Sequence, residues 1–428
     1  MKRHSIFTVW TLLFPLPFFV CRSGEPKGWD LITVDVAKSY LEKKLILRDK
    51  LRHLLMIGFS FIILSLVLSG CQSGYAEKIP TNLPIDYFVP LSPQVEMNVG
   101  DLFEEYYYIP LETREESLLD GIESIRNIAI HKGEIYVAVN SQIIVWDNQG
   151  RYKRSLSKRG QGADEYQSLG DFQIWPDGGI TLVSGEELIT YSSSFNLVHR
   201  QRFAGFGYIE TFSALDDSLV IVKKMPAVQG MTRYSVVNRF SGDIISEYDT
   251  IKKVNKYISA FANSFQHFDG HIISHGYQGN EILECMRDSS RVRYRLNIDN
   301  RVPPPGFWAQ DGKSYTDILL EESLKGYIGH IPDYIESPER ILFSFKGKKE
   351  ELEGIGLIDK KDGRGRVLGN ILFDDDFRWL PKQFFTLDDG WCVMLIDPYE
   401  ILKKETFAQR FPGLDEESNP VLFLAKMK

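Results

Sequence analysis

Cysteine is scarce in this sequence, and the patterns that mark common enzyme classes are missing. The four cysteines stand at positions 21, 71, 285 and 392, with no Cys-x-x-Cys pair and no metal-ligand spacing. There is no Gly-x-Ser-x-Gly elbow, phosphate-binding loop or dinucleotide fingerprint. Cys285 and Cys392 could form a disulfide, but the sequence does not decide whether they do. The sequence therefore specifies no reaction, and we expect no cofactor.

Positive charge and long apolar runs are also in short supply. The chain has 50 Lys and Arg against 58 Asp and Glu, and without residues 1–71 the balance is 40 against 53. Nucleic-acid-binding domains are usually basic, so we expect no nucleic-acid partner. The apolar stretches are short and rich in Val, Ile, Tyr and Phe, which favours β structure.

One longer apolar run ends in a cysteine. Residues 51–71 read LRHLLMIGFSFIILSLVLSGC, with no charge from Leu54 to Leu68. The ending Leu-Ser-Gly-Cys resembles the lipobox of bacterial lipoproteins, in which small residues admit the peptidase and the cysteine receives the lipid. A transmembrane helix is the alternative, although the run is shorter than the ~20 residues that a span needs. We expect a lipoprotein signal peptide at 51–71, lipidation of Cys71 and attachment to the membrane through its acyl chains.

Residues 1–50 form a leader-like extension of their own. Cys21 follows Phe18-Phe19-Val20, which is too bulky for a lipobox. We interpret these residues as a remnant of a related gene or as an over-extended start, with translation beginning near Leu51 or at Met56. After the signal peptide, residues 72–100 are rich in Pro, Asn and Ser, and we expect a tether and an extended lead-in there.

Six short apolar strands recur through residues 101–428, each after a polar or glycine turn. They begin at residues 133, 178, 217, 270, 339 and 390, and most steps are close to the ~40–50 residues of a propeller blade. A further apolar segment precedes these strands, and a second hairpin follows each of the first five. Four strands in each of six units predict an all-β fold, a six-bladed β-propeller of four-stranded antiparallel blades. A pair of β-sandwiches, the alternative, does not produce six equivalent hairpin pairs.

The sixth unit is one strand short. After the strand that begins at 390 come a helical turn, a loop and only one strand, at 420–428. The segment EEYYYIPL at 104–111 supplies the missing strand, so we expect the N- and C-terminal strands to share the closing blade. Sharing removes an exposed sheet edge. The step of 69 residues between blades four and five holds an insertion at 299–326, with a proline loop and a short amphipathic helix.

Three segments together resemble the bacterial six-bladed β-propeller lipoproteins related to NHL-repeat proteins. They are YYYIPLET at 106–113, GRYKRSLSKRGQGADEY at 150–166 and NPVLFLAKMK at 419–428. The family loop has the form Gly-x-Gly-Pro-Gly-Glu-Tyr, which Gly160, Gly162, Glu165 and Tyr166 match, while Ala163-Asp164 replaces Pro-Gly. The resemblance runs from about residue 85 to the end. It implies a propeller in the cell envelope but no particular activity.

The glycine-rich loop provides the main candidates for ligand binding. It joins the outer strand of blade one to the inner strand of blade two, and such connections surround the mouth of the central channel. Arg159, Gln161 and Glu165 could present polar groups there, whereas a structural role for Glu165 and Tyr166 in joining neighbouring blades is the competing interpretation. Trp308, in the proline loop of the insertion, could stack on a sugar.

Two further patterns suggest metal sites only weakly. HFDGHIISH places His267, His271 and His275 four residues apart, but the intervening Phe-Asp-Gly predicts a turn between strands and not one helical face. The run Asp374-Asp375-Asp376 lacks the alternating ligands and the glycine of a calcium loop. We predict no metal at either.

Two functions remain open at the level of the sequence. The first is a non-catalytic module that binds a glycan, a peptide or another envelope protein, and we prefer it because no group of residues has catalytic spacing. The second is a propeller enzyme, a lyase or a glycan-acting hydrolase, with its site at the channel mouth. We expect a monomer, anchored in the outer membrane and facing the periplasm.

Overall fold

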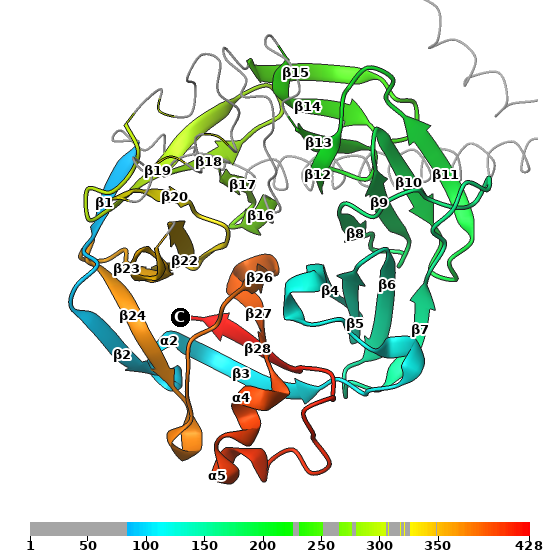
Figure 1. Ribbon diagram of the computed structural model, residues 1–428. Coiled ribbons are helices and arrows are strands. Elements are labelled where there is room, and N and C mark those ends of the chain that lie inside the picture. The colour runs from blue at the N-terminus through cyan, green and yellow to red at the C-terminus, as the bar shows by residue number, and fades with distance from the viewer. Residues whose placement is uncertain are drawn as a thin grey trace, which may run out of the picture. The chain divides into compact units, whose positions relative to one another are not determined.

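The strands of this protein form six sheets around a central axis (Figure 1). The structure is a computed structural model, and it describes residues 84–225, 231–250, 265–275, 280–304, 307, 317, 321, 326–347 and 349–428. Each sheet is one blade of a β-propeller, so the predicted six-bladed fold is confirmed. No helix among the described residues is long and apolar enough to cross a membrane.

Blades one to three each consist of four consecutive antiparallel strands, running from the axis outward (Figure 1). Blade one contains β4 (Ile125–His131), β5 (Glu134–Val139), β6 (Gln142–Asp147) and β7 (Tyr152–Leu156). Blade two contains β8 (Phe172–Ile174), β9 (Ile180–Ser184), β10 (Glu187–Tyr191) and β11 (Leu197–Arg202). Blade three contains β12 (Ile209–Ala214), β13 (Leu219–Lys224), β14 (Thr232–Asn238) and β15 (Ile244–Thr250).

Blades four to six follow the same order with additions. Blade four contains β16 (Phe265–Phe268), β17 (His271–His275), β18 (Glu281–Cys285) and β19 (Ser290–Ile298). In blade five, β20 (Ile328–His330) and β21 (Tyr334–Glu336) both pair with β22 (Arg340–Gly347), followed by β23 (Gly354–Asp359), β24 (Gly365–Leu372) and β25 (Arg378–Trp379). Blade six contains β26 (Phe384–Thr386), β27 (Trp391–Ile396), β28 (Val421–Met427) and β3 (Phe103–Pro110).

The two ends of the chain close the ring in blade six. Strand β3 pairs antiparallel with β28, in a register that places Pro110 opposite Val421 and Tyr106 opposite Ala425. The predicted sharing of the closing blade is therefore confirmed. Two short helices, α4 (Pro398–Leu402) and α5 (Glu405–Ala408), occupy the connection between β27 and β28, where a helical turn was predicted.

Two strands that the sequence pattern does not predict lie on the outside of the ring. β1 (Ile85–Val89) pairs in parallel with β19 and makes blade four a five-stranded sheet, and β2 (Gln94–Asn98) pairs in parallel with β24 and makes blade five a seven-stranded sheet. The short helix α2 (Val99–Leu102) then leads into β3. We call β1 and β2 the outer strap. The expected lead-in is thus part of the propeller from Ile85 onward, and it connects blades four, five and six.

Two-residue turns explain how short strands reverse direction beside the axis. Between β4 and β5 the turn residues Lys132 and Gly133 have φ angles of 48° and 75°, and between β16 and β17 Asp269 and Gly270 have 50° and 74°. Positive φ at both positions is the geometry whose twist matches paired strands. The first two strands of these blades therefore pair without a longer loop.

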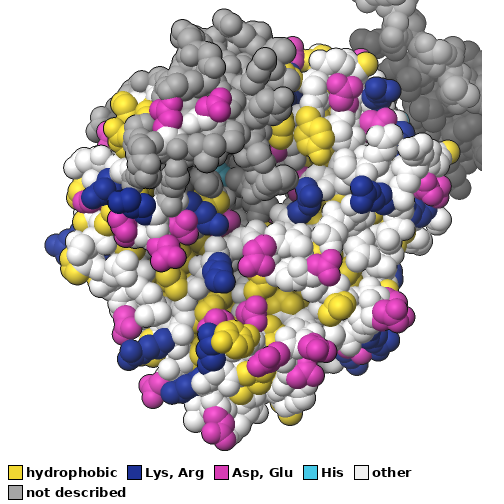
Figure 2. All heavy atoms as spheres, viewed as in Figure 1, with side chains coloured by type: hydrophobic (Ala, Val, Ile, Leu, Met, Phe, Trp, Pro, Cys, Tyr) yellow, Lys and Arg dark blue, Asp and Glu magenta, His cyan; other side chains and the backbone are white. Residues whose placement is uncertain are grey.

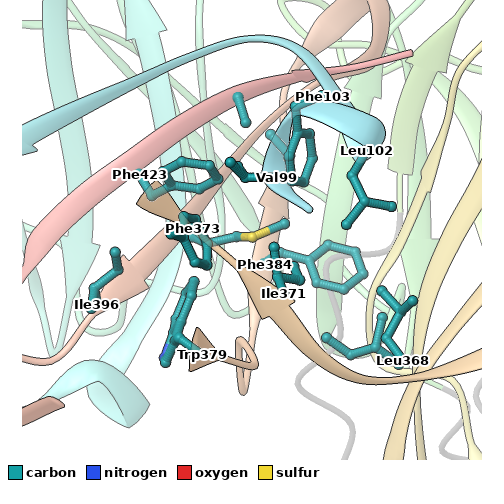
Figure 3. Packing of buried hydrophobic residues seen from close by; sticks show 14 of the residues in the cluster. Val99, Leu102, Phe103, Leu368, Ile371, Phe373, Trp379, Phe384, Ile396 and Phe423 are labelled. Atoms are coloured by element: carbon teal, nitrogen blue, oxygen red, sulfur yellow. The ribbon is translucent and has the colours of Figure 1, made fainter. Parts of the chain in front are cut away.

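Six hydrophobic clusters, one between each pair of neighbouring blades, stabilise the described part of the ring. Figure 3 shows the cluster between blades five and six, where Phe423 of β28 and Phe103 of β3 lie near Ile371 of β24. Val99 and Leu102 of α2 join the same cluster. Burial of each such large side chain stabilises the fold by about 1.5–3 kcal/mol, so the blades depend on one another.

The two cysteines of the described region do not pair. Cys285 lies in β18 of blade four and Cys392 in β27 of blade six, and both are buried free thiols. The insertion does separate blades four and five. Its expected helix at 314–330 lies mostly outside the described residues, as do residues 1–83 with Cys71 and the predicted signal peptide.

Five single-turn 3-10 helices complete the described elements. They are η1 (Glu115–Ser117), η2 (Ile122–Ser124), η4 (Glu350–Leu352), η5 (Asp374–Asp376) and η6 (Asp388–Gly390). η2 ends directly before β4, the inner strand of blade one, and its residues line the cavity described below.

Candidate functional site

A cavity of about 820 Å³ opens at one end of the propeller axis. Its lining comes from blades one, two, three, five and six, mostly from residues just before an inner strand or just after a second strand. These segments meet because, in a ring of four-stranded antiparallel blades, an outer strand ends on the face where the next inner strand begins. Figure 2 shows one face of the ring, where acidic, basic and hydrophobic side chains are interspersed. We call this cavity the channel mouth.

Asp171 lies in the channel mouth, directly before β8, and connects three blades. Its carboxylate accepts hydrogen bonds from Asn127 Nδ2 of blade one at 2.7 Å and from Thr211 Oγ1 of blade three at 2.5 Å. Burial raises the pKa of Asp171, and these hydrogen bonds oppose the rise. The side chain is thus held rigidly beside the axis.

Asp333 occupies the corresponding place before β21 in blade five, and only 5% of it is exposed. The Ser344 hydroxyl of β22 donates to the Asp333 carboxylate at 2.6 Å, and Ser344 Oγ accepts a hydrogen bond from the Asp333 backbone N–H at 3.0 Å. Burial raises the pKa of Asp333 to about 7. This carboxyl therefore changes its charge near neutral pH.

Glu210 of β12 also lines the channel mouth, with a buried lysine behind it. Lys223 Nζ of β13 lies 3.8 Å from Glu210 Oε2, and both side chains are less than a tenth exposed. Lys223 also donates to the backbone carbonyl of His275 in blade four at 3.3 Å. Burial lowers the pKa of Lys223 although Glu210 opposes this effect. The pair links blades three and four at the wall of the cavity.

The outer part of the channel mouth carries exposed cations and tyrosines. Arg126, Lys346 and Lys382 are all exposed lining residues. Tyr208 is 41% exposed and Tyr399, in α4, is 54% exposed. The mouth can therefore offer ion pairs, hydrogen bonds and aromatic contacts to a ligand.

The described residues contain no group of three or more His, Cys, Asp or Glu side chains that could hold a metal ion. The three histidines lie in the hairpin of β16 and β17, as predicted, and His267 and His271 have separate side-chain partners. His267 Nε2 is 2.7 Å from Ser213 Oγ, and His271 Nδ1 is 2.9 Å from Glu284 Oε1. Asp374 lies in η5, where it accepts a hydrogen bond from Tyr106 at 3.3 Å.

The predicted loop candidates lie in the connection between β7 and β8, but none of them lines the channel mouth. Arg159 and Gln161 are exposed. Glu165 accepts a hydrogen bond from the Gly162 backbone N–H at 2.7 Å, and a Cβ on Gly160 would fall 1.9 Å from its carboxylate. The glycines thus make room for a carboxylate that orders its own loop. That these residues bind a ligand stays a prediction.

Tyr166 has a clear structural role. Its ring is fully buried among side chains of blades one and two, and its hydroxyl donates to the Ser141 carbonyl oxygen at 2.6 Å. It packs edge-on against Tyr191 of blade two. Trp308, the remaining candidate, lies outside the described residues.

Sequence reasoning missed Asp171, Asp333 and Glu210. Each stands at or just before an inner strand, where a single charged residue looks like part of an ordinary turn. Comparing the six units position by position could have found Asp171 and Asp333, since both come immediately before an inner strand, β8 and β21.

Comparison with known proteins places the fold and the family. A protein of Bacteroides fragilis NCTC 9343, provisionally described as exported, has a TM-score of 0.67 at 14% identity, covering 80% of this chain and 99% of that chain. A member of the DUF4221 family from Bacteroides vulgatus reaches a TM-score of 0.44 at 11% identity, covering 76% of this chain and 97% of its own. At these identities the first likeness shows the fold, and the second carries no argument.

No curated protein matches the chain. Residues 87–426 match the model of the family described as "Domain of unknown function (DUF4934)". The match extends from β1 of the outer strap to β28, and so covers all six blades. The chain belongs to this DUF4934 family.

Proposed function

We propose that this protein is a lipid-anchored module of the bacterial cell envelope that binds its ligand, without catalysis, at the channel mouth. The ligand is a glycan, a peptide or part of another envelope protein. The observation that carries this proposal is the cavity of about 820 Å³, which falls within the roughly 300–1,000 Å³ of ligand sites in proteins. Its exposed tyrosines and cations lie around more buried carboxylates, an arrangement suited to a ligand with several polar groups.

The proposed location depends on the N-terminal sequence. Leu-Ser-Gly-Cys at 68–71 supports lipid attachment at Cys71, and the provisional description of the Bacteroides fragilis protein as exported supports the same compartment. We infer that the lipid holds the propeller at the outer membrane, facing the periplasm, as a monomer.

A ligand screen on the mature protein tests this function. Thermal shift measurements with glycans, peptides and divalent metals should identify compounds that raise the melting temperature, because a ligand that binds only the folded state stabilises it. Tyr399→Ala should then weaken binding about threefold to tenfold through lost aromatic contact. Tyr107→Ala is the matched control, since Tyr107 is 51% exposed but lies in β3 on the outside of blade six. Equal losses in both variants, or in neither, would contradict a site at the channel mouth.

A propeller enzyme, a lyase or a glycan-acting hydrolase, is the second candidate, and one observation favours it. A carboxyl that changes charge near pH 7 can act as a general acid or base at physiological pH, and Asp333 is such a group inside the cavity. If the protein turns over a glycan found in the screen, Asp333→Asn should lower kcat at least a hundredfold while leaving KM nearly unchanged. A ligand that binds and is recovered intact supports the binding module instead.

A further inference from the structure

In the described lining of the channel mouth, cations stand only in the outer part, whereas carboxylates stand in both the outer and the inner part. Within the part of its lining that the structure describes, six carboxylates stand against three cations, and those cations are the exposed Arg126, Lys346 and Lys382. The carboxylates of Asp333, Asp171 and Glu210 are more buried. The inner part of the cavity is therefore anionic.

The buried carboxylates differ in how their charge is balanced. Glu210 has the buried ammonium of Lys223 at 3.8 Å. Asp171 is held by the neutral side chains of Asn127 and Thr211, and Asp333 by the hydroxyl of Ser344. Neutral donors satisfy the geometry of a carboxylate but leave most of its charge uncompensated, which is why burial raises both pKa values.

The positive charge of Lys346 in β22 lowers the pKa of Asp333. This side chain is exposed, so water screens its charge. A cation that enters the cavity with a ligand would meet much less screening, because the low-dielectric wall strengthens its attraction to a carboxylate. A cationic group of a ligand could therefore pair with these buried carboxylates inside the cavity.

We propose that the ligand of the channel mouth is a basic peptide segment whose lysine or arginine side chain enters the cavity and pairs with Asp333 or Asp171. This inference rests on the proposed function, because it names the ligand class of the same site. A peptide suits the lining better than an amino sugar does. Its backbone carbonyls and acidic side chains can meet the exposed cations of the rim, and Tyr208 and Tyr399 can cover the aliphatic stem of the inserted side chain.

Calorimetric titration with paired peptides tests the charge directly. The probe is a short peptide with blocked ends and several lysines, and its counterpart carries norleucine at the same positions. Norleucine keeps the aliphatic stem and removes the ammonium group. The mature protein should bind the lysine peptide at least tenfold more tightly. Because the two titrations use the same unaltered protein, this comparison is independent of any effect of mutation on folding.

Substitution of the carboxylate supplies the second test. Asp333→Asn should weaken the lysine peptide at least tenfold, and the control Asp86→Asn, on an exposed side chain of β1, should leave its affinity unchanged. Asp333 is faced by Ser344 and Lys346 of β22 and by the backbone of Phe384 in β26. Binding should therefore tighten as the pH rises from about 6 to about 8 and Asp333 becomes charged, and this dependence should disappear in Asp333→Asn.

Each remaining outcome decides between explanations. Equal affinity for the lysine and norleucine peptides overturns the proposal, and so does stronger binding of an oligomer of glucosamine than of the lysine peptide. If a neutral ligand from the screen loses affinity in Tyr399→Ala while the lysine peptide does not bind, this inference fails and the proposed function stands. If no ligand responds to Tyr399→Ala, both fail.

Discussion

Asp333 carries a pH dependence that unfolding experiments can detect. Its pKa is about 7 in the folded protein, against an ordinary value of 3.8 that the unfolded chain should show. Between these values the folded state holds a proton that the unfolded state has lost, so stability should fall as the pH rises from about 4 to about 7 and level off above. The difference corresponds to roughly 4 kcal/mol of unfolding free energy.

Urea unfolding near pH 5 and near pH 8 measures this contribution. Asp333→Asn resembles the protonated side chain, so the variant should lose less stability than the wild type between the two values. Asp86→Asn, which alters an exposed carboxylate, should follow the wild type. Parallel curves for the wild type and Asp333→Asn would show that the carboxylate is not buried as described.

The sequence predicted individual site residues only in part. It drew attention to Glu165 and Tyr166 because they stand in a conspicuous glycine loop, and their contacts are largely local or structural. It did not indicate Asp171 or Asp333, because their role depends on which blades their neighbours come from. Asn127 and Thr211 reach Asp171 from positions about 40 residues away on either side, a proximity that only the closed ring creates.

Among the elements, the outer strap should contribute strongly to stability. Tyr87 and Val89 of β1 are almost fully buried, and loss of each would remove about 1.5–3 kcal/mol of hydrophobic stabilisation. Removal of β1 and β2 would also expose the edges of β19 and β24, and exposed edges promote aggregation. A chain that begins at Val99 should melt at a lower temperature and form larger species than one that begins at Pro84. Melting curves and size-exclusion chromatography compare the two, and equal behaviour would mean that the strap is dispensable.

The turn between β6 and β7 supports the ring closure through Gly150. Gly150 has a φ of 78°, and a Cβ there would fall 2.0 Å from the carbonyl oxygen of Pro110 at the end of β3. Gly150→Ala should therefore cost more than the ~1 kcal/mol of an unfavourable φ alone, with a loss of at least ~2 kcal/mol. Gly185→Ala is the control, because Gly185 has a φ of 65° with no atom within 4 Å of an added Cβ. Chemical denaturation of both variants separates backbone strain from steric clash.

Elements with a strong local pattern could be predicted, and the strap could not. All six recurring strands were found because β-branched and aromatic residues alternate with clear turns, as in β5 and β9. β2 reads QVEMN, and only one side of it is even partly buried, so nothing in it distinguishes a strand from an extended tether. Its pairing of Gln94 with Val367 joins distant parts of the chain in parallel, which no local signal announces.

At the scale of the whole molecule, the membrane anchor is the main untested prediction. Cys71→Ala should abolish lipid incorporation and shift the protein from the detergent phase to the aqueous phase on phase separation. Cys21→Ala should change neither, because the residues before Cys21 are too bulky for the peptidase. Mass spectrometry of the mature protein should find no peptide from residues 25–50, and finding one would contradict the interpretation of residues 1–50 as an extension.

The overall architecture was predictable because the same strand and turn pattern recurs along the chain. One hairpin with a Gly or Asn turn says little, but six at near-regular spacing leave few folds open. The sixth unit lacks one strand, which pointed to a replacement at the other end of the chain, and β3 occupies that place. The ligand was not predictable in the same way, since the described lining of the channel mouth comes from short segments of five blades and no one segment contains the site.

The shared closing blade also determines when folding can finish. Pro110 pairs with Val421, so about 310 residues separate the two strands, and bringing such distant segments together costs on the order of 5 kcal/mol of chain entropy. Strand β3 is synthesised early but has no partner until the last residues of the chain have been made. During this interval its edge is open to incorrect pairing, so we expect a chain that is exported during synthesis to depend on chaperones until its C-terminus arrives.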